Sequence, residues 1–310
     1  MAIDPLSDML SLLSVQFVTS GGFVAGGRWA LHFRRPDSIK FSAVIRGRCW
    51  LRMDGLDAPV QLEAGDVILM NGLQPLVLAS DMKKRPIDST MAFIKAVNGI
   101  ATIGNGKDFF MLGGHVALDS PLGDFLLEGL PLLIHIRSSS NEAETLRWLM
   151  QRLVEEYTAS RPGSASAQSQ IAQLMFIHSI RAYLASSSSL PTGWLQAFHD
   201  ERLAPAIEAM HNDPARQWSL KELANRAGMS RTNFALHFRS AVGTSPLVYL
   251  LRWRMRLAQK ALWEGNVGLS TLSESLGYTS ESAFSNAFKR EVGMAPKRYQ
   301  SMLKARNDQY

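Results

Sequence analysis

Cysteine is almost absent from this sequence, with Cys49 the single one among 310 residues. One thiol excludes a disulfide framework within the chain and fits a reducing compartment. Long hydrophobic runs are missing too, because no stretch approaches the roughly 18 consecutive apolar residues that span a membrane. The first ten residues, MAIDPLSDML, lack the basic start and the apolar run of a secretory signal. We therefore expect a cytoplasmic protein with no membrane partner.

Excess charge is absent from the first two thirds of the chain. Residues 1–199 contain 17 Lys and Arg and 17 Asp and Glu, whereas residues 200–310 contain 16 and 10. The whole net charge of +6 therefore belongs to the C-terminal third. A basic segment beside a neutral one favours a polyanionic partner for that segment, although a solvated basic surface gives the same balance.

Residues 28–80 have the pattern of short β-strands. Apolar and polar residues alternate from Trp29 to Arg34 and from Phe41 to Ile45, and Asp54-Gly55 is a strong hairpin signal. Turn signals recur about every 8 to 12 residues, which is typical of an antiparallel sandwich or barrel. The pattern weakens over residues 81–121, where we expect further strands and loops.

The hydrophobic period becomes helical from Asn141 onward. Apolar residues follow helical spacing over residues 146–157, and a second apolar helix is predicted over about residues 166–185. The sequence SSSSLPTG at residues 186–193 is typical of a flexible connector. The two helices either pack on the β-rich part or form the interface of a homodimer, and we favour the homodimer.

The C-terminal third contains two copies of one unit. The first is LANRAGMSRTNFALHFRSAVGTSPLVY, residues 223–249, and the second is LSESLGYTSESAFSNAFKREVGMAPKRY, residues 272–299. The matched positions are Leu223, Gly228, Phe234, Phe238, Val242, Gly243, Pro246 and Tyr249 in the first copy and Leu272, Gly277, Phe284, Phe288, Val292, Gly293, Pro296 and Tyr299 in the second. Because so many residues of restricted type coincide, the two copies are predicted to share one fold.

Each copy has the signals of a helix, a turn and a second helix. In the first copy Ser219 and Glu222 form a capping box, Gly228 ends the helix that follows, and Ser230 caps the next one. In that second helix Phe234 and the apolar residues four and eight positions later face the core. A turn with glycine between two short helices is the helix-turn-helix signature.

The outer face of each second helix is free to enter a DNA groove. These faces consist of Arg231, Thr232, Ala235, Leu236 and Arg239 in the first copy and of Ser280, Glu281, Ser282, Ala283, Ser285, Asn286, Lys289 and Arg290 in the second. Cationic side chains suit phosphates, short polar ones suit base edges, and alanine and leucine suit thymine methyl groups. Arg252, Arg254 and Arg256, between the copies, are candidates for phosphate contacts, with ion pairs inside the domain as the alternative.

The C-terminal residues resemble the DNA-binding domain of the AraC/XylS transcription regulators. The resemblance is carried by Gly277-Tyr278, Phe284, Phe288-Lys289, Gly293, Pro296 and Tyr299, and by Trp253-Arg254-Met255 with Leu257-Ala258. It implies two recognition helices in successive major grooves on one face of double-stranded DNA, joined by a rigid helix. His237 stands where that family usually has an apolar residue, and Ser273 stands where it usually has alanine.

The N-terminal residues resemble the cupin domain of one branch of the same family. The matching stretches are Asp4-Pro5-Leu6-Ser7-Asp8, residues 41–51, residues 62–67 and Leu112-Gly113-Gly114-His115. The resemblance implies a β-barrel sensor. Its candidates to line a pocket for a small-molecule effector are Trp29, Phe41, Ile45 and Trp50, for which ordinary core packing is the alternative.

A cupin-type metalloenzyme with an accessory nucleic-acid-binding domain is the alternative hypothesis for the whole chain. Cupin metal sites need a histidine cluster, and this sequence has Ser42, Val44 and Leu76 in the histidine slots. The other histidines of this part are His32, His115 and His135. Because these are scattered, we expect no metal, no cofactor and no catalytic residue.

The sequence thus predicts an α+β protein of two domains. An antiparallel, cupin-like β-barrel with following helices precedes an all-α domain of two helix-turn-helix units joined by a long helix. We place the sensor at residues 1–137, a helical dimerisation or linker region at 138–199 and the DNA-binding domain at 200–310. The favoured function is sequence-specific, effector-modulated regulation of transcription, with DNA, a second copy of the chain, a small molecule and RNA polymerase as partners.

Overall fold

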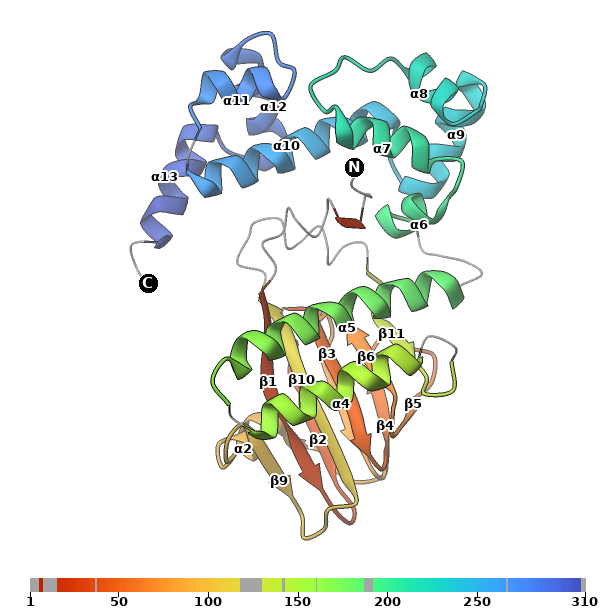
Figure 1. The fold of residues 1–310 in the computed structure, drawn as a ribbon, viewed down its shortest axis with the longest axis vertical. Coiled ribbons are helices and arrows are strands. Elements are labelled where there is room, and N and C mark those ends of the chain that lie inside the picture. The colour runs from red at the N-terminus through yellow and green to blue at the C-terminus, as the bar shows by residue number, and fades with distance from the viewer. Residues whose placement is uncertain are drawn as a thin grey trace. The chain divides into compact units, whose positions relative to one another are not determined.

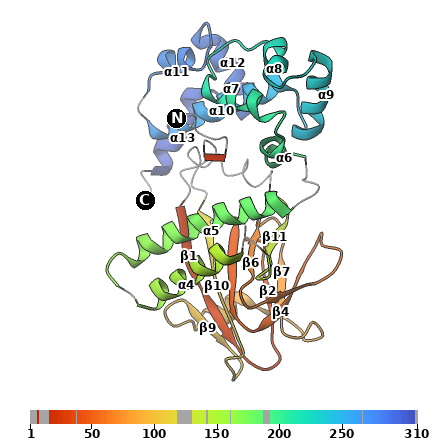
Figure 2. The ribbon, with the colours of Figure 1, turned by 45° about the vertical axis from the view of Figure 1, so that its right-hand side comes forward.

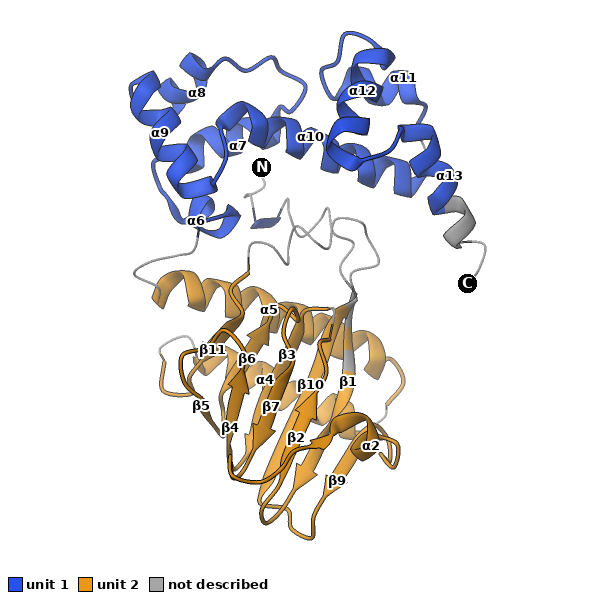
Figure 3. Ribbon diagram, turned by 180° about the vertical axis from the view of Figure 1, so that it is seen from behind, with its two compact units in different colours: residues 1–15, 118–129, 190–310 blue, residues 16–117, 130–189 orange. Residues whose placement is uncertain are grey.

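The computed structural model has a sheet-rich N-terminal part and an all-helical C-terminal part (Figures 1 and 2). It describes residues 6–7, 16–36, 38–117, 130–140, 143–159, 161–186, 192–265 and 267–307. Within these, residues 16–117 and 130–186 form one compact unit, and residues 192–307 belong to the other (Figure 3). Most of the N-terminal stretch Asp4–Asp8 and of the predicted connector at 186–193 lies outside the described residues. The two-domain prediction is confirmed.

The N-terminal unit contains two sheets. The larger sheet has the order β11-β6-β3-β10-β1-β9, with β1 at Gln16–Ala25, β3 at Lys40–Arg46, β6 at Val67–Met70, β9 at Ile100–Ile103, β10 at Phe109–Ala117 and β11 at Leu133–Ile136. The smaller sheet has the order β5-β4-β7-β2-β8, with β2 at Ala30–Phe33, β4 at Arg48–Met53, β5 at Val60–Glu63, β7 at Leu76–Ala79 and β8 at Ile87–Asp88. One hydrophobic core takes side chains from both, for example Val44 from β3 and Leu78 from β7. The sheets therefore pack as a sandwich.

The predicted closed antiparallel barrel needs two corrections. The described strands form two separately hydrogen-bonded sheets, and one of the two edge strands of each sheet is parallel to its neighbour, β9 to β1 and β8 to β2. A short helix, α2 at Ser89–Phe93, follows β8 directly and precedes β9, so the chain passes from the edge of one sheet to the edge of the other. A two-residue strand and a one-turn helix are too short to produce a hydrophobic period, which is why the pattern weakened here.

The larger sheet is buried on both faces. Val44 and Ile68 belong to the core between the sheets, whereas Phe41 pairs with Leu69 on the opposite face, and both are also buried. Helix α5, at Ser164–Ser186, contacts β1, β6 and β11 and lies with α4, at Ala143–Ala159, over this sheet (Figures 1 and 2). Burial on two faces explains why β6 is apolar at every position.

The C-terminal unit is built from helices α6 to α13. Their bounds are α6 Trp194–His199, α7 Ala204–Asn212, α8 Leu220–Arg226, α9 Arg231–Val242, α10 Pro246–Glu264, α11 Leu269–Ser275, α12 Glu281–Val292 and α13 Pro296–Asn307. Helix α6 packs on α9, and the Gly193 N–H donates to the Ala241 carbonyl at 2.9 Å. Residues 193–199, assigned above to the linker region, therefore pack within the helical unit. None of the described helices is long and apolar enough to span a membrane.

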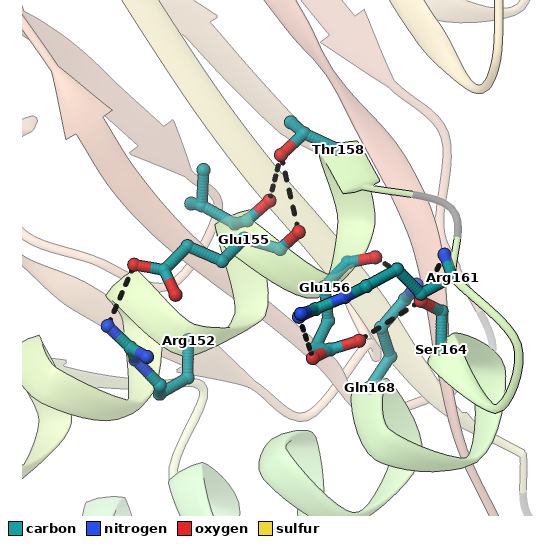
Figure 4. Close-up of polar contacts among 8 residues, drawn as sticks. Arg152, Glu155, Glu156, Thr158, Arg161, Ser164 and Gln168 are labelled. Atoms are coloured by element: carbon teal, nitrogen blue, oxygen red, sulfur yellow. Dashed lines mark hydrogen bonds and ion pairs between the residues drawn. The ribbon is translucent and has the colours of Figure 1, made fainter.

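The side-chain carboxylate of Glu156 holds the turn between α4 and α5 in place (Figure 4). Arg161 Nη2 lies 2.6 Å from Glu156 Oε1, and the Ser164 hydroxyl donates to Glu156 Oε2 at 3.0 Å. The Tyr157 hydroxyl also donates to the Asn98 carbonyl at 2.6 Å, which ties α4 to the loop before β9. The two predicted helices are present, and both pack on the β-rich part.

Candidate nucleic-acid interface

The two predicted helix-turn-helix units are α8 with α9 and α11 with α12. Gly228 and Gly277 have φ of +62° and +79°, a region in which residues with a Cβ are strained. After each glycine the next N–H reaches back to the first helix, from Met229 to Ala224 and from Tyr278 to Ser273, both at 2.9 Å. Both turns therefore have the same hydrogen-bonded C-cap.

The aromatic cores of the two units repeat the same geometry. The ring centroids of Phe234 and Phe238 are 5.6 Å apart, and those of Phe284 and Phe288 are 5.8 Å apart. The second phenylalanine of each pair then meets a tyrosine ring edge-on, with 5.7 Å to Tyr249 and 5.5 Å to Tyr299. All four phenylalanines are 0% exposed. Burying these rings on one side fixes which side of α9 and of α12 faces outward.

Helices α9 and α12 begin and end alike. Ser230 and Ser280 are the N-caps, whose hydroxyls accept from the N–H groups of Asn233 and Ala283. Each helix ends at a glycine in the left-handed conformation, Gly243 at φ +80° and Gly293 at φ +86°. Each is 12 residues long, so each presents about three turns to a partner.

The predicted DNA-contacting residues lie on the solvent side of these helices. The exposed ones are Arg231, Thr232, Leu236, Arg239, Ser280, Glu281, Ser282, Asn286, Lys289 and Arg290. Ala235 and Ser285, at matching positions, are half-buried. The structure thus brings each predicted set together on one helix face. Arg290 is the member with a carboxylate close by, since its Nε lies 3.5 Å from Glu291 Oε1.

The two outer faces differ at matched positions. Leu236 of α9 is 66% exposed, and Asn286 occupies the corresponding position of α12. Arg231 corresponds to Glu281, so the first residue of the helix carries opposite charge in the two units. Arg239 and Lys289, by contrast, place a cation at the same position of both. The two faces therefore share a cation of the kind that contacts phosphates. They differ at the positions whose side chains are suited to contact base edges.

The arginines of α10 have separate roles. Arg254 is 8% exposed, and its Nε and Nη2 donate to the carbonyls of Pro214 and Arg216 at 2.6 and 2.9 Å. Its guanidinium also lies 5.8 Å from the ring of Tyr278. Burial lowers the pKa of Arg254, while Tyr278 and Asp213 oppose that shift. This arginine therefore ties parts of the helical unit together, and its guanidinium is too buried to serve as a surface phosphate contact.

Arg254 belongs to an interlock that joins the two helix-turn-helix units. The loop at residues 213–219 precedes α8, yet the Gln217 side-chain amide donates to the Gly277 carbonyl of the other unit at 2.5 Å. A Cβ on Gly277 would collide with the Ala215 carbonyl. Arg252 lies elsewhere on α10 and forms a loose ion pair with Glu291, 3.8 Å apart. Arg254 belongs to a motif of the family resemblance, but no sequence pattern predicts that it bonds to the loop at residues 213–219.

The two departures from the family pattern have local explanations. His237 Nε2 lies 2.5 Å from Asp200 Oδ2, which ties α9 to the loop between α6 and α7. Ser273 is 2% exposed, and its hydroxyl donates to the Ser270 carbonyl at 2.8 Å. A serine whose hydroxyl bonds within its own helix is accommodated in a core position.

A cavity of about 400 Å³ lies inside the N-terminal unit. None of the four residues expected to line an effector pocket lines it. Trp29 and Phe41 are each 3% exposed and are packed in the unit, Ile45 is half-buried and Trp50 is 37% exposed. The residues of β3 that reach the cavity are Lys40 and Ser42.

Asp66 and Cys49 of the N-terminal unit are buried. Asp66 accepts from the N–H groups of Glu63 and Ser138, and His135 Nε2 lies 2.7 Å from its carboxylate. Burial, aided by the charge of Asp66, raises the pKa of Cys49 to about 12, so its thiol is unreactive at neutral pH. Among the described residues no three of His, Cys, Asp and Glu gather where they could hold a metal ion.

Comparisons with known proteins assign separate families to the N-terminal part and to the helix-turn-helix units. Residues 4–185 match the family model described as Cupin, and residues 223–302 match the model described as Helix-turn-helix domain. A protein of Streptomyces lividans described as an AraC-like transcription regulator is 39% identical over 297 residues, which are 96% of this chain and 98% of the relative. The HTH-type transcriptional regulator AlkR of Acinetobacter baylyi is 30% identical over 283 residues, covering 88% of this chain and 91% of the relative. Among solved structures, the DNA-binding domain of AdpA in complex with a target DNA is 30% identical, matches 36% of this chain and 100% of that chain, and gives a TM-score of 0.34.

Proposed function

This chain belongs to the family of AraC-type transcription regulators, which bind DNA through helix-turn-helix units, and from that premise we propose how its own residues do so. In this proposal α9 and α12 enter successive major grooves of one operator. The observation that carries the proposal is the pair of matched helices, each with two phenylalanines buried beneath and a polar strip exposed. An α-helix with such a strip fits the major groove of B-DNA.

Individual side chains have distinct parts in this proposal. Arg239 and Lys289 contact phosphates at matching positions of the two helices, which orients the protein without reading sequence. Asn286 reads adenine through its amide, while Leu236 contacts a thymine methyl group. Specificity at the α9 half-site then rests on Arg231, Thr232 and Leu236, and at the α12 half-site on Ser282, Ser285 and Asn286.

Binding measured at several salt concentrations tests these parts. We expect Lys289→Ala to weaken binding to all duplexes and to reduce the slope of log affinity against log salt by about 0.9, the value for one phosphate contact. We expect Asn286→Ala to lower affinity for the preferred site by roughly 1 to 3 kcal/mol and to relax base preference at one position. Lys95→Ala, in the N-terminal unit, removes one cation as a control. Unchanged slope and preference in both variants would reject the assignment.

We further propose that the chain is a homodimer and that α4 and α5 form the interface. Both helices bury one side on the sheet, yet Trp148 of α4 is 58% exposed and Leu174 of α5 is 45% exposed. Exposed apolar side chains that gather on neighbouring elements mark association surfaces, and α4 and α5 pack against each other. Sedimentation velocity should show a dimer that Trp148→Glu or Leu174→Glu weakens at least tenfold, while the equally apolar and exposed Met91→Glu does not. A monomeric wild-type chain would contradict this proposal.

We also propose that the protein is a regulator without catalytic activity, that it works in the cytoplasm and that it contacts RNA polymerase at its promoter. The relatives that match nearly the whole chain are described as transcription regulators, which supports this assignment over a cupin metalloenzyme. Metal analysis of the purified protein distinguishes the two, because stoichiometric iron, manganese or zinc would favour the enzyme.

A further inference from the structure

The cavity of the N-terminal unit is walled mainly by hydrocarbon side chains. Strands β1, β3, β6 and β10 of the larger sheet and β2 and β7 of the smaller one contribute to it. The apolar lining consists of Phe23, Phe33, Met70, Leu76, Leu78, Phe93 and Met111. Its volume of about 400 Å³ is within the range of small-molecule sites.

Two cationic side chains line this cavity, and they differ in whether a carboxylate pairs with them. Arg34 donates to Asp88 Oδ2 from both Nε and Nη2, at 2.9 and 2.8 Å, so its charge is already balanced. Lys40 is half-buried, and within the described part of the chain no carboxylate forms an ion pair with it. The described lining residues also include no Asp or Glu. One ammonium group in an apolar cavity is therefore left without a counter-charge.

We propose that this cavity binds an organic carboxylate with an apolar body, the carboxylate on Lys40 and the body among the aromatic and aliphatic side chains. The inference rests on the proposed function, for which it names the class of effector. A partly desolvated ammonium is costly unless an anion pairs with it. Ser42 lies two residues along β3, on the same face, and its hydroxyl adds a second donor. Because Arg34 is already paired with Asp88, the single unpaired cation matches a monoanion better than a phosphate dianion, which calls for more positive charge.

Helix α2 is the wall through which such a ligand enters. It contributes Ser89, Thr90 and Phe93 to the lining, yet it has no fully buried residue. Met91 and the following Ile94 are 67% and 69% exposed, while Ala92 and Phe93 are half-buried and pack against the core. A five-residue helix without a fully buried side chain has a low opening energy.

Isothermal titration of the full-length protein tests the proposal. The probes are decanoate and 4-phenylbutanoate, which carry the same head on different bodies, and decan-1-ol, which lacks the charge. We expect at least one carboxylate to bind, and decanoate to bind roughly 10- to 100-fold more tightly than the alcohol, as one charge-assisted contact implies. Lys40→Gln should remove that preference and leave the affinity for decan-1-ol unchanged. The matched control is Lys95→Gln, which neutralises a lysine outside the cavity.

Three results would overturn the proposal. These are no binding of either carboxylate, equal binding of decanoate and decan-1-ol, or equal loss in the Lys40→Gln and Lys95→Gln proteins. Thermal unfolding of each variant checks that the fold is kept. Operator binding by the ligand-free wild-type protein is measured in the same preparation. If operator binding persists while carboxylate binding fails, the effector class is wrong and the proposed function stands, whereas loss of operator binding counts against the proposed function itself.

Discussion

At the scale of single residues, the buried Asp66 carboxylate connects two separate segments of the N-terminal unit through three hydrogen-bonding groups. It is 4% exposed and joins the turn after β5 to the chain around His135 and Ser138. Burial alone would raise the pKa of Asp66, but the hydrogen bonds from His135, Ser138 and Glu63 outweigh it, and the pKa is lowered. A folded-state pKa below the unfolded value of about 3.9 means that the stabilisation is present at neutral pH and is lost as the pH falls below about 4.

Replacing Asp66 by asparagine should therefore cost stability at neutral pH. Two backbone N–H groups and the His135 ring lose a charged acceptor, and we expect a decrease of about 1 to 3 kcal/mol in the free energy of unfolding at pH 7. The difference from wild type should shrink when unfolding is measured at about pH 2, well below the unfolded pKa of an aspartate. Urea denaturation at both pH values provides the measurement, with the exposed Asp57→Asn as the control. A difference that stays constant with pH would show that the Asp66 charge does not contribute.

The residues of the two candidate sites, the outer faces of α9 and α12 and the cavity of the N-terminal unit, were not equally predictable from the sequence. The outward residues of α9 and α12 were predictable because the buried phenylalanines fix the helical phase. The cavity residues were not, because the large apolar side chains of β3, Phe41 and Ile45, suggest an inner face, whereas the residues that reach the cavity are Lys40 and Ser42. The cupin alignment had already placed Ser42 in an inward-facing slot. Since side chains alternate along a strand, that slot also identifies Lys40 as a residue on the inner face.

At the scale of secondary-structure elements, the two copies differ in how their first helices begin. Helix α8 has a complete capping box, in which Ser219 accepts from the Glu222 N–H and Glu222 accepts from the Ser219 N–H. Helix α11 begins at Leu269, and its N-cap residue, Gly268, provides no side-chain cap. Gly268 has φ of −68°, which any residue can adopt, and a Cβ there would meet nothing within 4 Å.

A capping box can therefore be added to α11. Gly268→Ser with Thr271→Glu reproduces the Ser219–Glu222 spacing, and we expect the double variant to gain roughly 0.5 to 1 kcal/mol from the cap and from the lower entropy of the unfolded chain. Calorimetric unfolding should show a higher transition temperature. Thr271→Glu alone is the control and should gain less. A lower transition temperature in the double variant would mean that the N-terminus of α11 is constrained by a contact absent from this structure.

Elements with a strong period were predictable, and elements fixed by distant pairing were not. The helices of both helix-turn-helix units follow from capping residues, turn glycines and phenylalanine spacing. The parallel pairings of β8 and β9 depend on partners far away in the sequence, in β2 and β1, and a two-residue strand contains no pattern that could identify them. Membership of α6 in the helical unit likewise depends on contacts with α9.

At the scale of the whole helical unit, we expect the interlock of Arg254 with the loop at 213–219 to determine how far apart α9 and α12 can lie. Arg254→Ala removes the donor to the carbonyls of Pro214, Ala215 and Arg216, and we expect the two helix-turn-helix units to move independently. Affinity for a duplex carrying both half-sites should fall by about 1 to 3 kcal/mol. Affinity for a single half-site should stay unchanged.

Fluorescence anisotropy with spaced duplexes provides the measurement. Inserting one or two base pairs between the half-sites should cost the wild-type protein more than the Arg254→Ala protein. Lys95→Ala is the control, since it removes an exposed cation of the N-terminal unit. If wild type and Arg254→Ala discriminate equally between the duplexes, the interlock does not set the spacing.

The near-identical ring geometry beneath α9 and α12 has a consequence for engineering. Because the same buried scaffold supports both outer strips, the side chains of one strip can be transplanted onto the other helix without repacking its interior. A chain carrying the α12 strip twice would then recognise a tandem target, with the same short sequence written once per turn of the double helix. Target choice in this molecule is thus an exchangeable surface property, separable from the architecture that supports it.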